Sequence, residues 1–308
     1  MNEILLVDAQ NLAIRSHFAH ATLKTREGQM SGLVFGFLRD VLRLHRKCPD
    51  APMIFCWDGG GKTWRHRAYQ DYKGQRKIMP WREEVKSQLD DLIPLLDSLG
   101  FHNPRLKGVE ADDIIGILSK RLTKKWFVRI FSSDRDMYQL LGPKVTVWTR
   151  KKIGQVWTEY FVSEVEAAAW LGAPFRALLE IKAMAGDPSD NLKGLPRVGF
   201  KTAVKLWKEG LRVGEVSNGK LWKRYDCAKH WPRIQEEYRL AHIVRDTTAS
   251  VWTKEQSAEL KKMVAGIVLH PHRPEKYSDD MRDALYNVLG RYELEEIFKK
   301  RQMFWQIK

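Results

Sequence analysis

Three short apolar runs in the first half of the chain each end just before an aspartate. Asp8 follows Ile4–Val7, Asp58 follows Met53–Trp57, and Asp134 comes shortly after Val128–Phe131. Apolar runs alternating with amphipathic stretches are typical of the buried strands and crossover helices of an α/β sheet. Because ligand sites in such sheets form beyond the carboxyl ends of the strands, we expect the three aspartates to converge on one edge.

Six further acidic residues fall where folding would bring them to the same place. Three of them open a predicted helix at Ala111–Leu122, one follows the third aspartate, and two lie in a Gly/Pro-rich turn: Glu110, Asp112, Asp113, Asp136, Asp187 and Asp190. Carboxylates gathered this closely raise one another's pKa unless cations neutralise them. Oxygen-only ligands suit Mg²⁺ or Mn²⁺, so the sequence predicts a site for several metal ions.

The charge balance indicates the kind of substrate. The chain has 53 lysines and arginines against 38 acidic residues, a net charge of +15, although many of the acids belong to the predicted cluster. A basic surface of this size is typical of proteins that bind nucleic acid, although a merely soluble basic protein is the simpler alternative. An acidic metal pocket within a basic surface favours phosphodiester chemistry.

The pattern of the chain changes near residue 160. Before it we predict helices at Gly32–Arg46, Glu83–Leu99 and Ala111–Leu122, and a strand pair at 145–149 and 155–158. After it the strand pattern stops, and Ser163 begins a helix with a capping box. We therefore expect a catalytic core at residues 1–160 and a helical region at 161–308.

Other features bear on the location of the protein. The chain enters a strand at once, and no run of about 18 apolar residues occurs, so we expect neither a secretory signal nor a membrane span. Its three cysteines have no metal-ligand spacing. We expect a cytoplasmic protein.

The stretch from Trp64 to Arg82 interleaves seven basic residues with four aromatic ones. Aromatic rings stack on unpaired bases while basic side chains follow phosphates, which is how single-stranded nucleic acid is held. The alternative is an ordinary solvated loop with long amphipathic side chains.

A second turn, Gly194–Gly199, opens a predicted helix, and backbone N–H groups at such a helix start can bind phosphate. A P-loop needs glycine and lysine to be adjacent, but Phe200 separates Gly199 from Lys201, which excludes that motif.

Six motifs occur in the order found in one known superfamily: Leu6-Val-Asp-Ala-Gln-Asn11, Trp57-Asp58 with Lys62-Thr-Trp-Arg65, Asp71-Tyr-Lys-Gly-Gln-Arg76, Gly108-Val-Glu-Ala-Asp-Asp113, Ser133-Asp-Arg-Asp-Met137 and Gly186-Asp-Pro-Ser-Asp-Asn191. The chain resembles the 5′-nuclease (flap endonuclease) superfamily, in the branch of bacteriophage 5′-exonucleases and the 5′-nuclease domain of bacterial DNA polymerase I. The resemblance implies a PIN-like α/β core, a helical arch at about 64–90, and a helix–three-turn–helix at about 180–210 that binds duplex DNA.

The resemblance also implies roles for single residues. The nine acids would hold or surround two or three Mg²⁺ ions, for which Mn²⁺ would substitute. Lys73 and Arg76 would grip the scissile phosphate, and Tyr72 would stack on a base. Predicted DNA contacts are Arg65, Lys193, Gly194, Arg197, Gly199, Lys201, Thr202 and Lys205. Relatives hold a K⁺ ion with backbone carbonyls of the helix–three-turn–helix, where this chain has Arg197 in place of the usual glycine.

The function implied is that of a structure-specific 5′-nuclease, a 5′-3′ exonuclease and flap endonuclease. Its partners would be branched or 5′-ended DNA and RNA primers on DNA, and we expect a monomer. Two alternatives stay open: a catalytically inactive DNA-binding paralogue, and a PIN-type ribonuclease that acts on structured RNA.

Overall fold

The computed structural model describes residues 2–75, 79–154, 156–213, 219–269 and 278–300. The strands are β1 (Glu3–Asp8), β2 (Met53–Cys56), β3 (Phe127–Phe131), β4 (Val145–Ile153) and β5 (Val156–Val162). The helices up to β5 are α1 (Ala9–Ala19), α2 (Gly32–Lys47), α3 (Trp64–Ala68), α4 (Trp81–Ser98), α5 (Ala111–Leu122) and the 3₁₀ helix η1 (Arg135–Leu140). The later helices are α6 (Glu164–Leu171), η2 (Phe175–Ala177), α7 (Leu178–Ala185), α8 (Phe200–Lys208), α9 (Lys220–Arg224), α10 (Cys227–Ala241), α11 (Lys254–Ala265), α12 (Asp279–Arg291) and α13 (Glu295–Lys300).

The five strands form one sheet in the order β2-β1-β3-β4-β5, in which only the β4–β5 pair is antiparallel. Since successive side chains of a strand point to opposite faces, β1 contributes to both sides of the sheet. Ile4 and Leu6 pack into the core shared with α5, whereas Leu5 and Val7 pack into the core shared with α1, α2 and α4. The sheet is thus buried on both faces.

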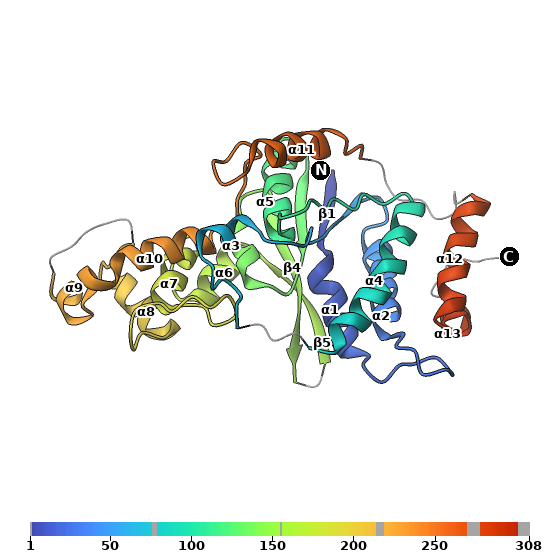
Figure 1. Cartoon of the computed structure of the whole chain (residues 1–308), viewed down its shortest axis with the longest axis horizontal. Helices are drawn as coiled ribbons and strands as arrows, with labels where there is room; N and C mark the ends of the chain where they lie inside the picture. The colour runs from blue at the N-terminus through green and yellow to red at the C-terminus, as the bar shows by residue number, and fades with distance from the viewer. Residues whose placement is uncertain (1, 76–78, 155, 214–218, 270–277, 301–308) are drawn as a thin grey trace.

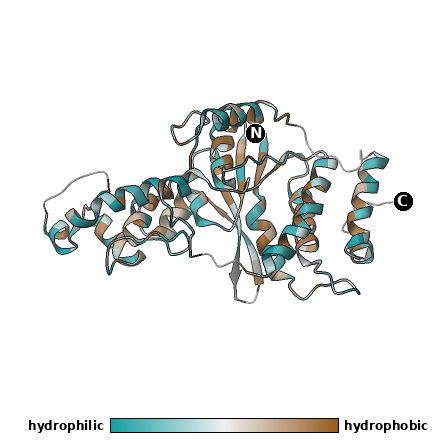
Figure 2. Cartoon of the chain, viewed as in Figure 1, coloured by the Kyte–Doolittle hydropathy of each residue, from teal (hydrophilic) through white to brown (hydrophobic). Residues whose placement is uncertain are grey.

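Figure 1 shows the sheet in the middle of an elongated molecule, with α7, α8, α9 and α10 on one side and α12 and α13 on the other. Helix α7 packs against both α8 and α10. The helices in Figure 2 carry both hydrophobic and hydrophilic residues, as expected for helices with one buried face. No helix within the described ranges is long and apolar enough to cross a bilayer.

Most of the predicted elements are confirmed. The mixed α/β fold is present, α5 has the predicted bounds, and α2 and α4 differ from prediction by one or two residues at their ends. Ser163 caps α6, and Glu166 completes the capping box.

The segment that the resemblance assigns to the arch, at about 64–90, contains helices and turns in its described part. Helix α3 ends at Ala68, residues 70–75 are turns, and α4 begins at Trp81. Lys73 itself takes φ = +55°, a left-handed conformation that a continuous helix cannot contain.

Candidate metal centre

The aspartate at the end of β1 lies at the centre of the carboxyl edge of the sheet. Asp8 is buried, accepts a hydrogen bond from the Asn11 backbone N–H (3.1 Å), and accepts another from the Ser132 hydroxyl (2.7 Å). Burial, with smaller contributions from the charges of Asp134 and Asp58, raises the pKa of Asp8 to about 7. A carboxylate with a pKa this high lacks compensation for its charge.

Asp112, in the first turn of α5, faces the same edge. Burial raises its pKa well above the usual range, and the negative charges of neighbouring acids raise it further: Asp8, Asp134, Glu110 and Asp58. The last two strand-end acids are exposed, and each is held by a backbone hydrogen bond: the Ala111 N–H donates to Asp58 (2.8 Å) and the Asp136 N–H donates to Asp134 (2.8 Å). We call Asp8, Asp58, Asp112 and Asp134 the inner cluster.

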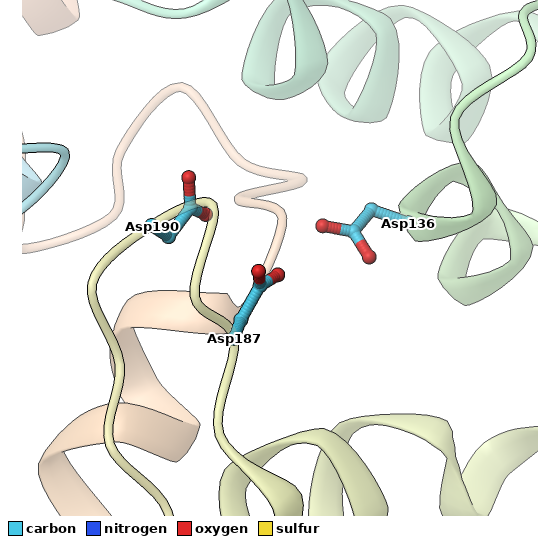
Figure 3. Close-up of side chains that lie close together, drawn as sticks. All are labelled: Asp136, Asp187 and Asp190. Carbon is cyan, nitrogen blue, oxygen red and sulfur yellow. The ribbon is translucent and has the colours of Figure 1, made fainter. Parts of the chain in front are cut away.

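A second group of carboxylates comes from η1 and from the turn after α7. One oxygen from each of Asp136, Asp187 and Asp190 lies within 4.8 Å of the others. Figure 3 shows Asp136 pointing from η1 toward the loop that carries the other two. We call these three residues the outer triad. It has the all-oxygen donor set that suits Mg²⁺, Mn²⁺ or Ca²⁺.

A lysine that the sequence analysis missed lies against the outer triad. The Lys182 ammonium on α7 is 2.5 and 2.7 Å from the two Asp136 oxygens and 2.8 Å from an Asp187 oxygen. Although burial opposes it, the charge of Lys182 lowers the pKa of Asp187. Burial still raises the pKa of Asp136, and Lys182 reduces that rise. The signal in the sequence is a lysine in the last turn of the helix that leads into the acidic turn.

Glu110 lies between the two groups. One of its oxygens accepts from the Lys73 ammonium (2.5 Å), and the other accepts from Arg65 (2.5 Å) and from the Tyr72 hydroxyl (3.4 Å). Burial opposes ionisation, but Arg65 and Lys73 lower the pKa of Glu110. The Tyr72 hydroxyl also lies 3.3 Å from an oxygen of Asp190, so it connects Glu110 to the outer triad.

Three predicted roles do not fit the geometry. Asp113 is fully buried, and its oxygens accept from the Arg65 guanidinium (2.8 and 2.9 Å), the Trp64 indole (3.2 Å) and the Val244 N–H (2.9 Å). It is thus engaged away from the inner cluster. Arg65 is 3% exposed and offers no surface to DNA. Tyr72 is also buried, so its ring is not free to stack on a base.

The predicted DNA contacts divide into two groups. Gly194 is buried, and its N–H, like that of Lys193, donates to the buried carboxylate of Glu237 (2.8 and 2.9 Å), so neither N–H is free for a phosphate. The other predicted contacts lie at the surface, with Thr202 partly exposed: the Lys193 side chain, Arg197, Gly199, Lys201, Thr202 and Lys205. Arg197 takes φ = +63°, which explains why glycine is usual there. Arg76 lies outside the described residues.

The fold and its edge together define a class: an α/β protein that gathers carboxylates beyond the carboxyl ends of the parallel strands of its sheet. The chain belongs to the 5′-3′ exonuclease family, because the family model for the 5′-3′ exonuclease N-terminal resolvase-like domain matches residues 3–167.

Curated relatives agree with this assignment. The chain is 37% identical over 216 residues to a 5′-3′ exonuclease of Bacillus subtilis, covering 68% of this chain and 70% of that protein. It is 34% identical over 258 residues to DNA polymerase I of the same organism, covering 81% of this chain but 28% of the polymerase. The chain thus spans little more than a quarter of that relative's length.

Solved structures share the fold across the chain. The bacteriophage T5 D15 flap endonuclease, in a pseudo-enzyme–product complex with DNA and metal ions, has a TM-score of 0.64 at 18% identity, covering 95% of this chain and all of that one. Flap endonuclease-1 from Methanococcus jannaschii has a TM-score of 0.52 at 16% identity, covering 94% and 93%. At these identities the likeness shows the fold alone.

Proposed function

We propose that the protein is a structure-specific, divalent-metal-dependent 5′-nuclease that hydrolyses DNA phosphodiesters at 5′ flaps, nicks and RNA primers. The observation that carries the proposal is the convergence of the inner cluster and the outer triad on one edge of the sheet, in a chain of this family. The raised pKa values of Asp8 and Asp112 support it, because buried like charges need cations.

Two or three Mg²⁺ ions would be held by the inner cluster and the outer triad, with Mn²⁺ able to replace them. Bound divalent ions supply Lewis-acid stabilisation of phosphoryl charge and lower the pKa of water. The chain's own acids hold these charges at fixed positions: the Asn11 N–H and the Ser132 hydroxyl orient Asp8, and the Ala111 N–H orients Asp58.

Lys73 is the basic residue best placed to act on the scissile phosphate. Its ammonium contacts Glu110, whose charge in turn raises the pKa of Asp112 in the inner cluster. When a phosphate replaces Glu110 as the partner of its ammonium, Lys73 would neutralise charge that develops on the phosphoryl oxygens. Such a contact is worth about a hundredfold in rate. Arg76, which the resemblance assigns to the same phosphate, would have the same role. The buried Tyr72 would connect Glu110 and Asp190 through its hydroxyl and thus help to fix the acids.

The exposed basic residues around the turn before α8 would bind duplex DNA. Lys193, Arg197, Lys201 and Lys205 all reach the surface there. Backbone carbonyls of the same turn would hold a K⁺ ion. The T5 D15 flap endonuclease was solved with DNA and metal ions on the same fold, which supports the proposal. We further propose that the protein acts as a monomer in the cytoplasm.

Cleavage of a 5′-labelled flap substrate with and without Mg²⁺ tests this function. We expect short 5′ products with Mg²⁺ and none with EDTA, and strongly reduced cleavage by the Asp112→Asn variant. Duplex binding without cleavage would identify an inactive DNA-binding paralogue. Faster cleavage of a matched RNA hairpin than of the DNA flap would identify a PIN-type ribonuclease.

A further inference from the structure

A cavity of about 680 Å³ opens beside the outer triad and is not used by the chemistry described above. Its lining includes Asp136, Lys182 and Asp187, together with Trp170 of α6 and Phe200 of α8. Apolar side chains also line it, among them Leu171, Leu178 and Val204. Figure 1 shows α6, α7 and α8 on the same side of the sheet. A volume of this size is typical of a small-ligand site.

Three planar side chains surround this cavity. The rings of Trp170 and Phe200 have centroids 5.5 Å apart with an interplanar angle of 41°, and the Arg135 guanidinium lies 4.7 Å from the Trp170 ring centroid. Trp170 is 38% exposed and Phe200 is 37% exposed. Large aromatic side chains that remain this accessible together mark an interaction site more often than a core. Aromatic rings and guanidinium groups are the surfaces on which nucleobases stack.

The charges around the rings fit a nucleotide. Arg135 and Lys201 add positive charge at the cavity, and Lys201 is also one of the exposed residues expected to contact DNA. Two residues of the outer triad, Asp136 and Asp187, line the cavity, and the proposed function places the triad near the reacting phosphate. A nucleotide with its base against the rings would therefore have its phosphate near cations and close to the acids.

We propose that this cavity, which we call the aromatic pocket, binds one unpaired nucleobase of the DNA substrate next to the cleavage site. The inference rests on the proposed function and extends it. A base inside a duplex has both faces covered by its neighbours, so only an unpaired or terminal base can offer a face to Trp170 or Phe200. The aromatic pocket would thus recognise the point at which base pairing ends at a nick or flap, and not the base sequence of the DNA.

The test combines a protein variant with a substrate variant. The affinity of the wild type and of Trp170→Ala for a 5′ flap is measured in Ca²⁺, with single abasic sites placed in turn at three positions on each side of the branch. Stacking on an aromatic side chain is worth about 1–3 kcal/mol, so Trp170→Ala should weaken binding of the intact flap by about 5- to 150-fold. At one of these positions, the abasic site should weaken binding to the wild type by the same factor and should leave binding to Trp170→Ala unchanged.

Matched variants separate stacking from folding. Trp170→Phe keeps a ring and should keep most of the affinity, whereas Phe200→Ala, at an exposed helix start, should repeat the effect of Trp170→Ala. Tyr160→Ala removes a comparably exposed ring from β5 and should change nothing. Thermal unfolding checks that each variant is folded. If Trp170→Ala does not fold, the same measurements with Phe200→Ala test the inference.

Two results would overturn the inference. In the first, the loss of binding free energy from Trp170→Ala and the loss from the abasic site are additive at all six positions, while the wild type still cleaves the flap. The aromatic pocket then does not bind a base, and the proposed nuclease function stands. If the wild type neither binds nor cleaves the flap, the proposed function fails and the aromatic pocket falls with it.

Discussion

The inner cluster and the outer triad hold negative charge in different ways. In the inner cluster, burial and like charge raise the pKa of Asp8 to about 7 and raise the pKa of Asp112 well above its usual range, so bound protons reduce the negative charge of this cluster near neutral pH. In the outer triad, the ammonium of Lys182 lies between Asp136 and Asp187 and lowers the pKa of Asp187. One group is compensated by protons and the other by a lysine.

This difference has a consequence for metal binding. A divalent ion entering the inner cluster must displace protons, so its affinity there should depend on pH. An ion entering the outer triad must displace the ammonium of Lys182, so its affinity there should depend on that one side chain. The two sites should therefore respond to different changes.

The largest effect is expected from Asp112→Asn. Loss of one ligand of the inner cluster should lower single-turnover cleavage of a 5′ flap by about a thousandfold or more, since bound metal ions contribute several kcal/mol to such reactions. Duplex binding in Ca²⁺ should persist, because the exposed basic residues near α8 carry it. The metal-free variant should also unfold at a higher temperature than the wild type, since burying Asp112 requires either a bound proton or an uncompensated charge, and an amide requires neither. Near-normal turnover would contradict the assignment of the inner cluster.

The same substitution one residue later should have the opposite effect on stability. Asp113→Asn places an amide against the buried Arg65 guanidinium, which loses its main partner. Removing one partner of a buried ion pair lowers the free energy of unfolding by about 3–5 kcal/mol. Urea unfolding of the variant and the wild type would measure this difference directly. If Asp113→Asn instead stabilised the metal-free protein, Asp113 would belong to the inner cluster after all.

These neighbouring aspartates show how far the sequence predicts the site. Acids at strand ends are predictable, because the carboxyl ends of parallel strands must meet at one edge. The first turn of α5 is different: successive helical residues are rotated by about 100°, and the sequence does not reveal which of two adjacent acids turns toward that edge. Packing against α3 determines which acid is buried, because Arg65 and Trp64 donate hydrogen bonds to Asp113 in the core.

Other misses have the same origin in tertiary packing. Arg65, Tyr72 and Gly194 are predicted to contact nucleic acid, yet each is buried and contacts a segment distant in sequence. Arg65 donates to the carbonyls of Leu240 and His242, the Tyr72 hydroxyl donates to Asp190, and the Gly194 N–H donates to Glu237. Lys182 was missed because it precedes the acidic turn by several residues. Its ammonium contacts Asp187 only because α7 ends between the two residues and the chain then turns. Local pattern predicts elements and strand-end acids, but not the partners that neutralise them.

A pH titration of stability isolates the proton-compensated group. The folded pKa of Asp8 is about 7, against an ordinary value of 3.8, so the folded state binds the additional proton. The resulting stabilisation of the metal-free protein is complete below about pH 4 and is lost as the pH rises through 7, on the order of 4 kcal/mol. Urea unfolding in EDTA between pH 4 and 8 measures it, and Asp8→Asn should remove this part of the slope. A wild type and variant with parallel pH dependence would show that Asp8 is compensated in some other way.

The smallest effect is expected at the lysine-compensated group. In Lys182→Met an incoming ion no longer displaces an ammonium, so Mn²⁺ affinity at the outer triad should rise about tenfold, equivalent to about 1.4 kcal/mol. Affinity at the inner cluster should stay unchanged, and the metal-free variant should be less stable, since Asp136 and Asp187 lose their cation. Calorimetric titration with Mn²⁺ separates the two sites when Asp187→Asn is measured alongside. Lys208→Met, on the exposed end of α8, removes the same charge away from the acids and serves as control. If both lysine variants bind Mn²⁺ alike, Lys182 remains in place when the ion binds, and ammonium and ion do not compete for the outer triad.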